Sequence, residues 1–303
     1  MTVVVNFPQD VRDWLIAHLE RGTPNDAIAA QLEAQNVPAA LARSIVQTVA
    51  RAVAAGTPPA AGRLSVDDDA PLAQAAYRPD APLRAASAHT HRIGEHEVRV
   101  LARLERPALA LFDGLLDDGE CDALIALATP RLVATRVADP VTGRDVVAAH
   151  RSAQGAFFRP QETELVARIE ARIEALTGVP REHGEGLQMV RYLPGTESTP
   201  HFDYLLTHNP ANVESIERSG QRIATLIMYL NDVEAGGETT FPEVGMTVVP
   251  RKGHAVYFEY GNRLGQTDPA SAHAGAPLRA GEKWIATKWL RARRFVPRGT
   301  QGA

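Results

Sequence analysis

The tripeptide His201-Phe202-Asp203 lies about two-thirds of the way along this 303-residue chain, and the rest of the sequence is best understood from it. On an extended segment, residues i and i+2 point to the same face. His201 and Asp203 would therefore direct an imidazole and a carboxylate towards one point, a combination that suits a divalent metal ion. Taken alone the pattern is common, and a surface histidine beside a solvated aspartate explains it equally well.

A second histidine downstream strengthens the metal hypothesis. His273, within the segment Ser-Ala-His-Ala-Gly, is the best candidate for a third ligand. Two histidines and one carboxylate that leave three coordination positions open form the facial triad of non-haem Fe(II) oxygenases. Lys283 follows His273 by ten residues and can supply a cation for a ligand carboxylate.

Four spaced segments carry a family resemblance. They are His201-Phe-Asp203, Gly236-Gly-Glu-Thr-Thr-Phe-Pro242, His273-Ala-Gly-Ala-Pro277 and Lys283-Trp-Ile-Ala-Thr-Lys-Trp289. In this order they resemble the prolyl 4-hydroxylase family of 2-oxoglutarate- and Fe(II)-dependent dioxygenases, over roughly residues 105–295. The resemblance implies a double-stranded β-helix, or jelly roll, with supporting helices. It also implies hydroxylation of proline in a peptide or protein by O2, coupled to decarboxylation of 2-oxoglutarate to succinate, with ascorbate as a further cofactor.

The resemblance assigns roles to individual residues. His201, Asp203 and His273 would be the catalytic iron ligands. Lys283 would pair with the distal carboxylate of 2-oxoglutarate, Tyr192 would donate its phenol to the same carboxylate, and Thr225 would line the same pocket. A solvated lysine at a strand end and a core tyrosine are the structural alternatives.

Two further residues match positions that face the substrate in the family. Arg222 would hydrogen-bond a substrate carbonyl and Trp289 would stack on a proline ring, whereas a surface ion pair and barrel packing are the structural alternatives. One departure bears on specificity, because Ser198 replaces an aromatic residue that precedes the His-x-Asp motif in the family. The same chemistry on a free amino acid or another small molecule therefore stays open. A catalytically silent jelly-roll binding module and a zinc hydrolase are the alternatives of other classes.

Composition limits the remaining options. The net charge of −4 argues against a nucleic-acid binder, because such proteins rely on positive charge. The single cysteine, Cys121, excludes an internal disulfide and fits the cytoplasm. The segment Thr2–Phe7 lacks the features of a secretory signal, and no run of 18 apolar residues predicts a membrane span. The abundance of alanine and arginine suggests a bacterial source.

The sequence predicts an α+β protein of two unequal domains. Residues 1–57 form three short helices, an all-α bundle that would dock substrate or mediate a homodimer. Residues 58–98 form a Pro/Ala-rich linker, 99–296 the dioxygenase domain and 297–303 a tail. Within the dioxygenase domain, helices are expected near 117–127 and 163–176. Strands are expected at 99–104, 108–112, 186–192, 222–230, 238–241, 246–249, 254–260 and 283–290. The polar segment Leu205–Gly220 is predicted to be a mobile loop over the site.

Overall fold

A computed structural model describes residues 2–35, 37–67, 77–78, 80, 88–134, 136–138, 145–147, 153–206 and 210–298. The chain divides into two compact units, Met1–Ala76 and Tyr77–Ala303. Across the described ranges, no helix is both long and apolar enough to cross a membrane. The predicted tail, 297–303, lies mostly outside these ranges.

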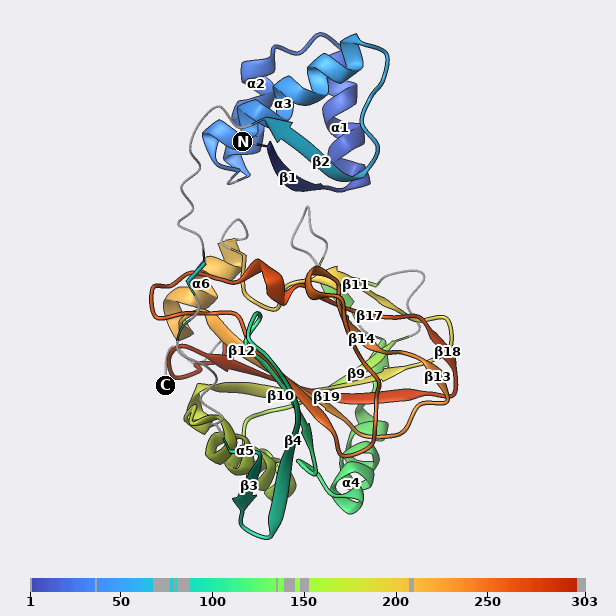
Figure 1. Cartoon of the computed structure of the whole chain (residues 1–303), viewed down its shortest axis with the longest axis vertical. Coiled ribbons are helices and arrows are strands. Elements are labelled where there is room, and N and C mark those ends of the chain that lie inside the picture. Colours follow the sequence, from blue (N-terminus) through green and yellow to red (C-terminus); the bar gives the residue numbers. More distant parts are fainter. Residues whose placement is uncertain are drawn as a thin grey trace. The chain divides into compact units, whose positions relative to one another are not determined.

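The first unit contains three helices packed on a two-stranded sheet (Figure 1). Its elements are β1 (Thr2–Phe7), α1 (Gln9–Glu20), α2 (Asn25–Ala34), α3 (Ala39–Ala54) and β2 (Gly62–Asp67). β1 runs antiparallel to β2, with Val3 opposite Val66 and Val5 opposite Leu64. The core joins helix residues such as Leu15 and Ile28 to the strand residues Leu64 and Val66.

The three predicted helices are present, but the prediction of an all-α unit was wrong. β1 and β2 lie on either side of the helices in the sequence, and each is ordered by pairing with the other. A local periodicity search does not detect such pairing. The predicted end of this domain at residue 57 falls before β2. The predicted linker, 58–98, contains β2 together with β3 (Thr90–Ile93) and the start of β4 (His96–Leu104).

The second unit is built on two antiparallel sheets. Among the described residues, the larger sheet has nine strands in the order β3-β4-β5-β16-β12-β19-β10-β9-β6 and the smaller has four, β11-β17-β14-β15. The further bounds of the larger sheet are β5 (Leu109–Asp113), β16 (Ala255–Glu259), β12 (Arg222–Tyr229), β19 (Lys283–Arg291), β10 (Gly184–Tyr192), β9 (Gln154–Phe158) and β6 (Val133–Ala134). Those of the smaller sheet are β11 (Ser198–His201), β17 (His273–Gly275), β14 (Thr239–Phe241) and β15 (Met246–Val248). Two short pairs complete the strands, β13 (Ala235–Gly236) with β18 (Leu278–Ala280) and β7 (Arg136–Ala138) with β8 (Asp145–Val147).

Each face of the larger sheet is covered by a different layer (Figure 1). Helices α4 (Asp118–Ala128) and α5 (Glu164–Thr177) pack on one face and share a hydrophobic core with it. The aliphatic stripe predicted for α5 is buried there: Leu165, Val166, Ile169, Ile173 and Leu176. Each such side chain contributes roughly 1.5–3 kcal/mol on burial. The other face packs against the smaller sheet through a second core that includes Ile227, Phe241 and Phe258. This mixed arrangement of helices and two facing sheets is consistent with the predicted jelly roll.

The remaining helices are short. α6 (Pro210–Ser219) occupies most of the segment 205–220, so the prediction of a mobile loop there was wrong. The helix is held by long-range contacts, since Arg291 donates to the carbonyl and hydroxyl oxygens of Ser215. The 3-10 turns are η1 (Thr129–Arg131), η2 (Arg181–His183), η3 (Pro242–Val244) and η4 (Pro269–Ser271).

Candidate active site

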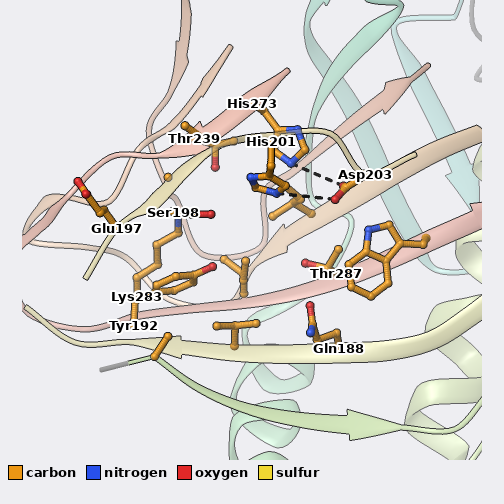
Figure 2. A pocket seen from close by; sticks show the side chains of 17 residues that line it. Gln188, Tyr192, Glu197, Ser198, His201, Asp203, Thr239, His273, Lys283 and Thr287 are labelled. Carbon is orange, nitrogen blue, oxygen red and sulfur yellow. Dashed lines mark ion pairs between the residues drawn. The ribbon is translucent and has the colours of Figure 1, made fainter. Parts of the chain in front are cut away.

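His201, Asp203 and His273 meet between the two sheets (Figure 2). His201 ends β11 and His273 begins β17, and the two residues are directly opposed in the antiparallel pair. Their Nε2 atoms lie 3.8 Å and 3.6 Å from the two carboxylate oxygens of Asp203. One ligand atom from each residue lies within 4.8 Å of the others. The three residues singled out by the sequence therefore converge on one point.

Backbone carbonyls fix both imidazoles in the same way. Nδ1 of His201 donates to the carbonyl of Thr199 at 2.9 Å, and Nδ1 of His273 donates to the carbonyl of Ser271 at 3.1 Å. In each case the partner is two residues upstream, and the contact directs Nε2 towards Asp203. Burial lowers the pKa of His273 below its ordinary value, against the opposing effect of Asp203. A neutral imidazole is the form that binds a metal.

Asp203 is buried and held as a carboxylate. Burial alone would raise its pKa, but the neighbouring imidazoles, the Arg222 guanidinium and the Thr225 hydroxyl together lower it. Thr225 Oγ1 donates to Asp203 Oδ2 at 2.7 Å and lies 2.9 Å from the hydroxyl of Tyr260. Two imidazole Nε2 atoms and one carboxylate, with the other side open to a cavity, fit an Fe(II) ion.

Lys283 points into the same cavity (Figure 2). Its side chain is 4% exposed, and Nζ donates to the carbonyl of Gly237 at 2.6 Å. Within the described residues, no carboxylate lies at ion-pair distance from it. Burial lowers its pKa to about 8, although Glu238 acts in the opposite direction. A buried ammonium without a counterion is costly. The site is therefore suited to a ligand that brings its own carboxylate.

Two aromatic rings lie close to Lys283, and that of Tyr192 lines this end of the cavity. The ring of Tyr192 lies 5.3 Å from Nζ and that of Tyr229 lies 5.8 Å from it. The structure thus places the predicted residue Tyr192 beside Lys283. Thr239 also lines the cavity, and its hydroxyl accepts a hydrogen bond from Tyr229. Thr239 lies in the Gly236–Pro242 motif, but the sequence argument did not assign it a role.

β19 supplies one wall of the cavity along its whole length. Lys283, Ile285, Thr287 and Trp289 alternate along the strand and all line the cavity. Gln188 lines it from the neighbouring strand β10. Period-2 alternation could have identified Thr287 and Gln188, because each shares a strand face with a residue already selected.

Two of the predicted contact residues lie behind the cavity rather than in it. Thr225 is fully buried and supports Asp203, so its position does not match a role in lining the co-substrate pocket. Arg222 also does not line the cavity. Its guanidinium is committed to the carboxylate of Glu185 at 2.7 and 2.9 Å and to the carbonyl of Asp203 at 3.1 Å. Its Cζ lies 4.1 Å from the ring centroid of Trp289, which does line the cavity.

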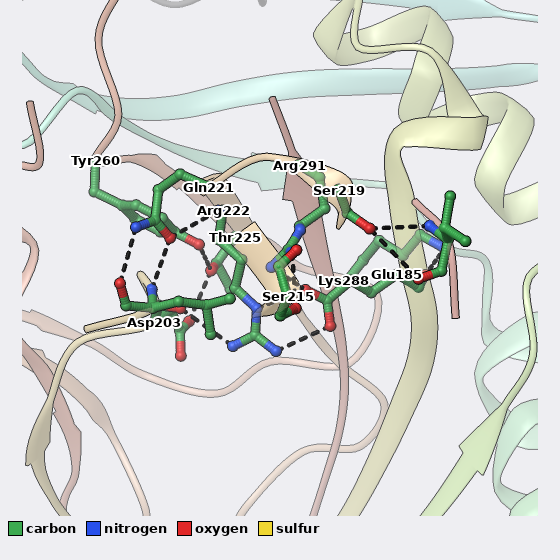
Figure 3. A network of polar contacts seen from close by, with 12 residues as sticks. Glu185, Asp203, Ser215, Ser219, Gln221, Arg222, Thr225, Tyr260, Lys288 and Arg291 are labelled. Atoms are coloured by element: carbon green, nitrogen blue, oxygen red, sulfur yellow. Dashed lines mark hydrogen bonds and ion pairs between the residues drawn. The ribbon is translucent and has the colours of Figure 1, made fainter. Parts of the chain in front are cut away.

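A network of buried charges extends from Asp203 through the sheet (Figure 3). The carboxylate of Glu185 is shared between Arg222 and Arg291. Arg291 is fully buried, and its Nη1 lies 3.3 Å from Oε1 of Glu185. Lys288 forms an ion pair of 2.5 Å with Glu170 of α5 and also donates to the carbonyl of Glu185. Because each buried charge faces an opposite one, the network can fix the backbone around His201, Asp203 and His273.

A second group of metal-binding side chains is already occupied by a cation. His96, Asp117 and Glu120 lie close enough together to share an ion. Arg172, however, donates to both carboxylate oxygens of Glu120 at 2.6 and 2.8 Å, and lies 2.6 Å from Nε2 of His96. This cluster is therefore a buried ion pair that joins α4 to α5.

Comparison with known proteins places these features in a family. Residues 187–291 match the family described as the 2OG-Fe(II) oxygenase superfamily. Prolyl 4-hydroxylase 5 of Arabidopsis thaliana is 36% identical over 221 residues, which are 67% of this chain and 74% of that protein. Probable prolyl 4-hydroxylase 7 of the same plant is 38% identical over 207 residues, but this chain spans only 64% of its length. The alignment of 189 residues with the rat prolyl 4-hydroxylase subunit alpha-1, at 38% identity, covers 62% of this chain and 35% of that subunit.

Solved structures include a similar viral enzyme. The viral collagen prolyl hydroxylase of Paramecium Bursaria Chlorella virus-1, in a 2OG complex, is 28% identical. The match covers 61% of this chain and 95% of that one, with a TM-score of 0.48.

Proposed function

Because this chain belongs to the prolyl 4-hydroxylase family of 2-oxoglutarate- and Fe(II)-dependent oxygenases, we propose that it hydroxylates proline within a peptide or protein. The enzyme would consume O2 and 2-oxoglutarate and release succinate and CO2. The observation that carries the proposal is one cavity that contains both the three metal ligands and the buried ammonium of Lys283. We further propose that the two facing sheets form a double-stranded β-helix.

Each side chain has a defined task in this proposal. His201, Asp203 and His273 hold Fe(II), which when bound supplies the O2-activating chemistry that the protein itself lacks. Lys283 binds the distal carboxylate of 2-oxoglutarate, and Tyr192 covers the same end of the cavity. The apolar residues of β19 and β12 exclude water around the reacting atoms.

Trp289 is the proposed contact for a peptide. Its indole ring lines the cavity, and within the described part of the chain its buried Nε1–H has no hydrogen-bond partner. Because that N–H is not exposed to the cavity, the proposed contact is stacking of the indole face on a substrate proline ring. Arg222 acts indirectly, since its stacking on the indole holds the ring in place.

A smaller substrate is the second candidate, and Ser198 favours it. Ser198 lines the cavity where the family has an aromatic residue, so this wall offers less apolar surface for a peptide. A free amino acid or another small molecule would then be hydroxylated by the same chemistry. The proposal also includes ascorbate as reductant, from the family resemblance, and a cytoplasmic location, from the single cysteine. It includes a homodimer as one possible role of the N-terminal helices.

Succinate formation tests the proposal directly. The protein would be purified without oxygen and supplied with Fe(II), 2-oxoglutarate, ascorbate and air, with and without a library of proline-rich peptides. We expect peptide-stimulated succinate in the wild type and none in His201→Ala or Lys283→Ala. Turnover that responds to free amino acids instead of peptides would select the second candidate. A folded, iron-loaded protein that forms no succinate would contradict the enzymatic proposal.

A further inference from the structure

Asp268 is a buried carboxylate that lies five residues before His273 and does not contact the cavity. Its side chain is 1% exposed. Oδ1 accepts a hydrogen bond from the backbone N–H of Ala270 at 3.0 Å, and the carbonyl of Asp268 accepts one from Ser271 Oγ at 2.7 Å. Asp268 therefore begins and shapes the 3-10 turn η4.

The η4 turn determines how the imidazole of His273 is held. The carbonyl of Ser271, the last residue of the turn, accepts the hydrogen bond from Nδ1 of His273. The backbone N–H of Asp268 donates to the carbonyl of Tyr260 at 2.8 Å, which ties the turn to the end of β16. The corresponding partner of His201, Thr199, lies within strand β11 itself. His273 thus depends on a turn, whereas His201 depends on a strand.

Arg106 clamps this turn from a different part of the fold. It lies in the loop between β4 and β5, and its Nη2 and Nε atoms lie 3.1 and 3.2 Å from Oδ1 of Asp268. Nε also lies 3.3 Å from Oδ2. Arg106 is half-exposed, yet its partner is almost completely buried. Burying a carboxylate is costly unless it is paired, and Arg106 provides the pair.

We propose that Arg106, acting through Asp268, is a positioning residue for His273. The ion pair holds the η4 turn so that the Ser271 carbonyl fixes the rotation of the imidazole and keeps Nε2 directed at the metal position. Partners of this kind around a metal ligand typically change metal affinity by about 10- to 100-fold when removed. The inference rests on the proposed metal-binding role of His273.

The full-length chain offers a matched pair of variants. Arg106→Gln removes the clamp. Arg263→Gln removes a neighbouring exposed ion pair of 3.3 Å between Arg263 and Asp80, on the loop that leads into the same turn. Binding of Mn(II), a redox-stable substitute for Fe(II), is followed by the loss of the electron paramagnetic resonance signal of the free ion. Thermal unfolding of the metal-free variants is measured in parallel.

We expect Arg106→Gln to bind Mn(II) about 10- to 100-fold more weakly than the wild type. Arg106→Lys should recover part of this loss because it restores the charge. Arg263→Gln should stay within about twofold, since exposed pairs contribute little. The metal-free unfolding midpoint of Arg106→Gln should also fall, because Asp268 stays buried without its counterion, so Mn(II) binding is compared at a temperature at which every variant is folded. Asp268→Asn should weaken Mn(II) binding as well. If Asp268→Asn does not fold because residue 268 is buried, Arg106→Gln alone provides the test.

Two results would overturn the inference. In the first, Arg106→Gln binds Mn(II) as tightly as Arg263→Gln does. In the second, Arg106→Lys is no better than Arg106→Gln, which would show that the charge is irrelevant. A wild-type protein that does not bind Mn(II) at all would instead overturn the proposed metal site itself, so the two failures are distinguishable.

Discussion

Raising the pH from 7 to 9 should weaken the binding of 2-oxoglutarate roughly tenfold if the ammonium of Lys283 receives its distal carboxylate, as proposed above. Burial lowers the pKa of this lysine to about 8 when no ligand carboxylate is present. Only the protonated form binds the anion, so the apparent dissociation constant grows as the ammonium fraction falls. Relative to its value for the fully protonated lysine, this constant should be almost unchanged at pH 7, about twofold higher at pH 8 and about elevenfold higher at pH 9.

Calorimetric titration of the Mn(II)-loaded protein under nitrogen measures this dependence without turnover. Pyruvate serves as the control ligand, since it has the 2-oxo acid group but no distal carboxylate. Lys283→Arg serves as the control protein, because a guanidinium stays protonated throughout this range. We expect both controls to give nearly flat profiles between pH 7 and 9.

The reasoning fails if pyruvate and 2-oxoglutarate weaken in parallel, because the titrating group would then lie at the metal and not at Lys283. A flat profile for 2-oxoglutarate in the wild type would also refute it. That result would mean that the ammonium keeps its proton well above pH 8 despite its burial.

Three further substitutions test the surroundings of the site. Thr225→Val removes the hydrogen bond to Asp203 and should weaken Mn(II) binding about tenfold in the same titration. Lys288→Met leaves the carboxylate of Glu170 buried without its cation and should lower the free energy of unfolding by about 3–5 kcal/mol in urea, whereas a loss below about 1 kcal/mol would show that the carboxylate does not need this ion pair. Trp289→Ala should raise the KM for a peptide at least about tenfold. Peptide-free succinate formation should persist in that variant, and its loss would point to a damaged barrel.

The predictable parts of the structure are those with local signals. The aliphatic stripe on α5 and the alternation along β10, β12 and β19 gave elements within a few residues of those observed. The convergence of His201, Asp203 and His273 was also predictable, because His201 and Asp203 are two residues apart and His273 lies in a recognisable motif. Spacing and short motifs of this kind are visible in a single sequence.

Features that depend on pairing between distant segments were not predictable. β1 and β2 are stabilised by each other across three helices, and α6 by contacts with β19. The orientations of the Arg222 and Thr225 side chains also depend on contacts with residues distant in the sequence. Residues matched to a motif can turn towards a neighbouring carboxylate instead of the cavity, and only the packed structure reveals that Glu185 and Asp203 are those neighbours.

β19 separates two environments at every residue, and this restricts how the site can evolve. Lys283 and Trp289 lie six residues apart on one face, about 20 Å along the strand, while Lys288 on the opposite face reaches Glu170 of α5. Inserting or deleting one residue between them would exchange the faces. The buried ammonium would then move to the helix side, and an apolar core residue would replace it in the cavity. Because the strand is paired on both sides, with β12 and β10, no free edge can absorb the change. A change of one residue in the length of β19 would therefore need a compensating β-bulge, of the kind found in its partner strands β10 and β12.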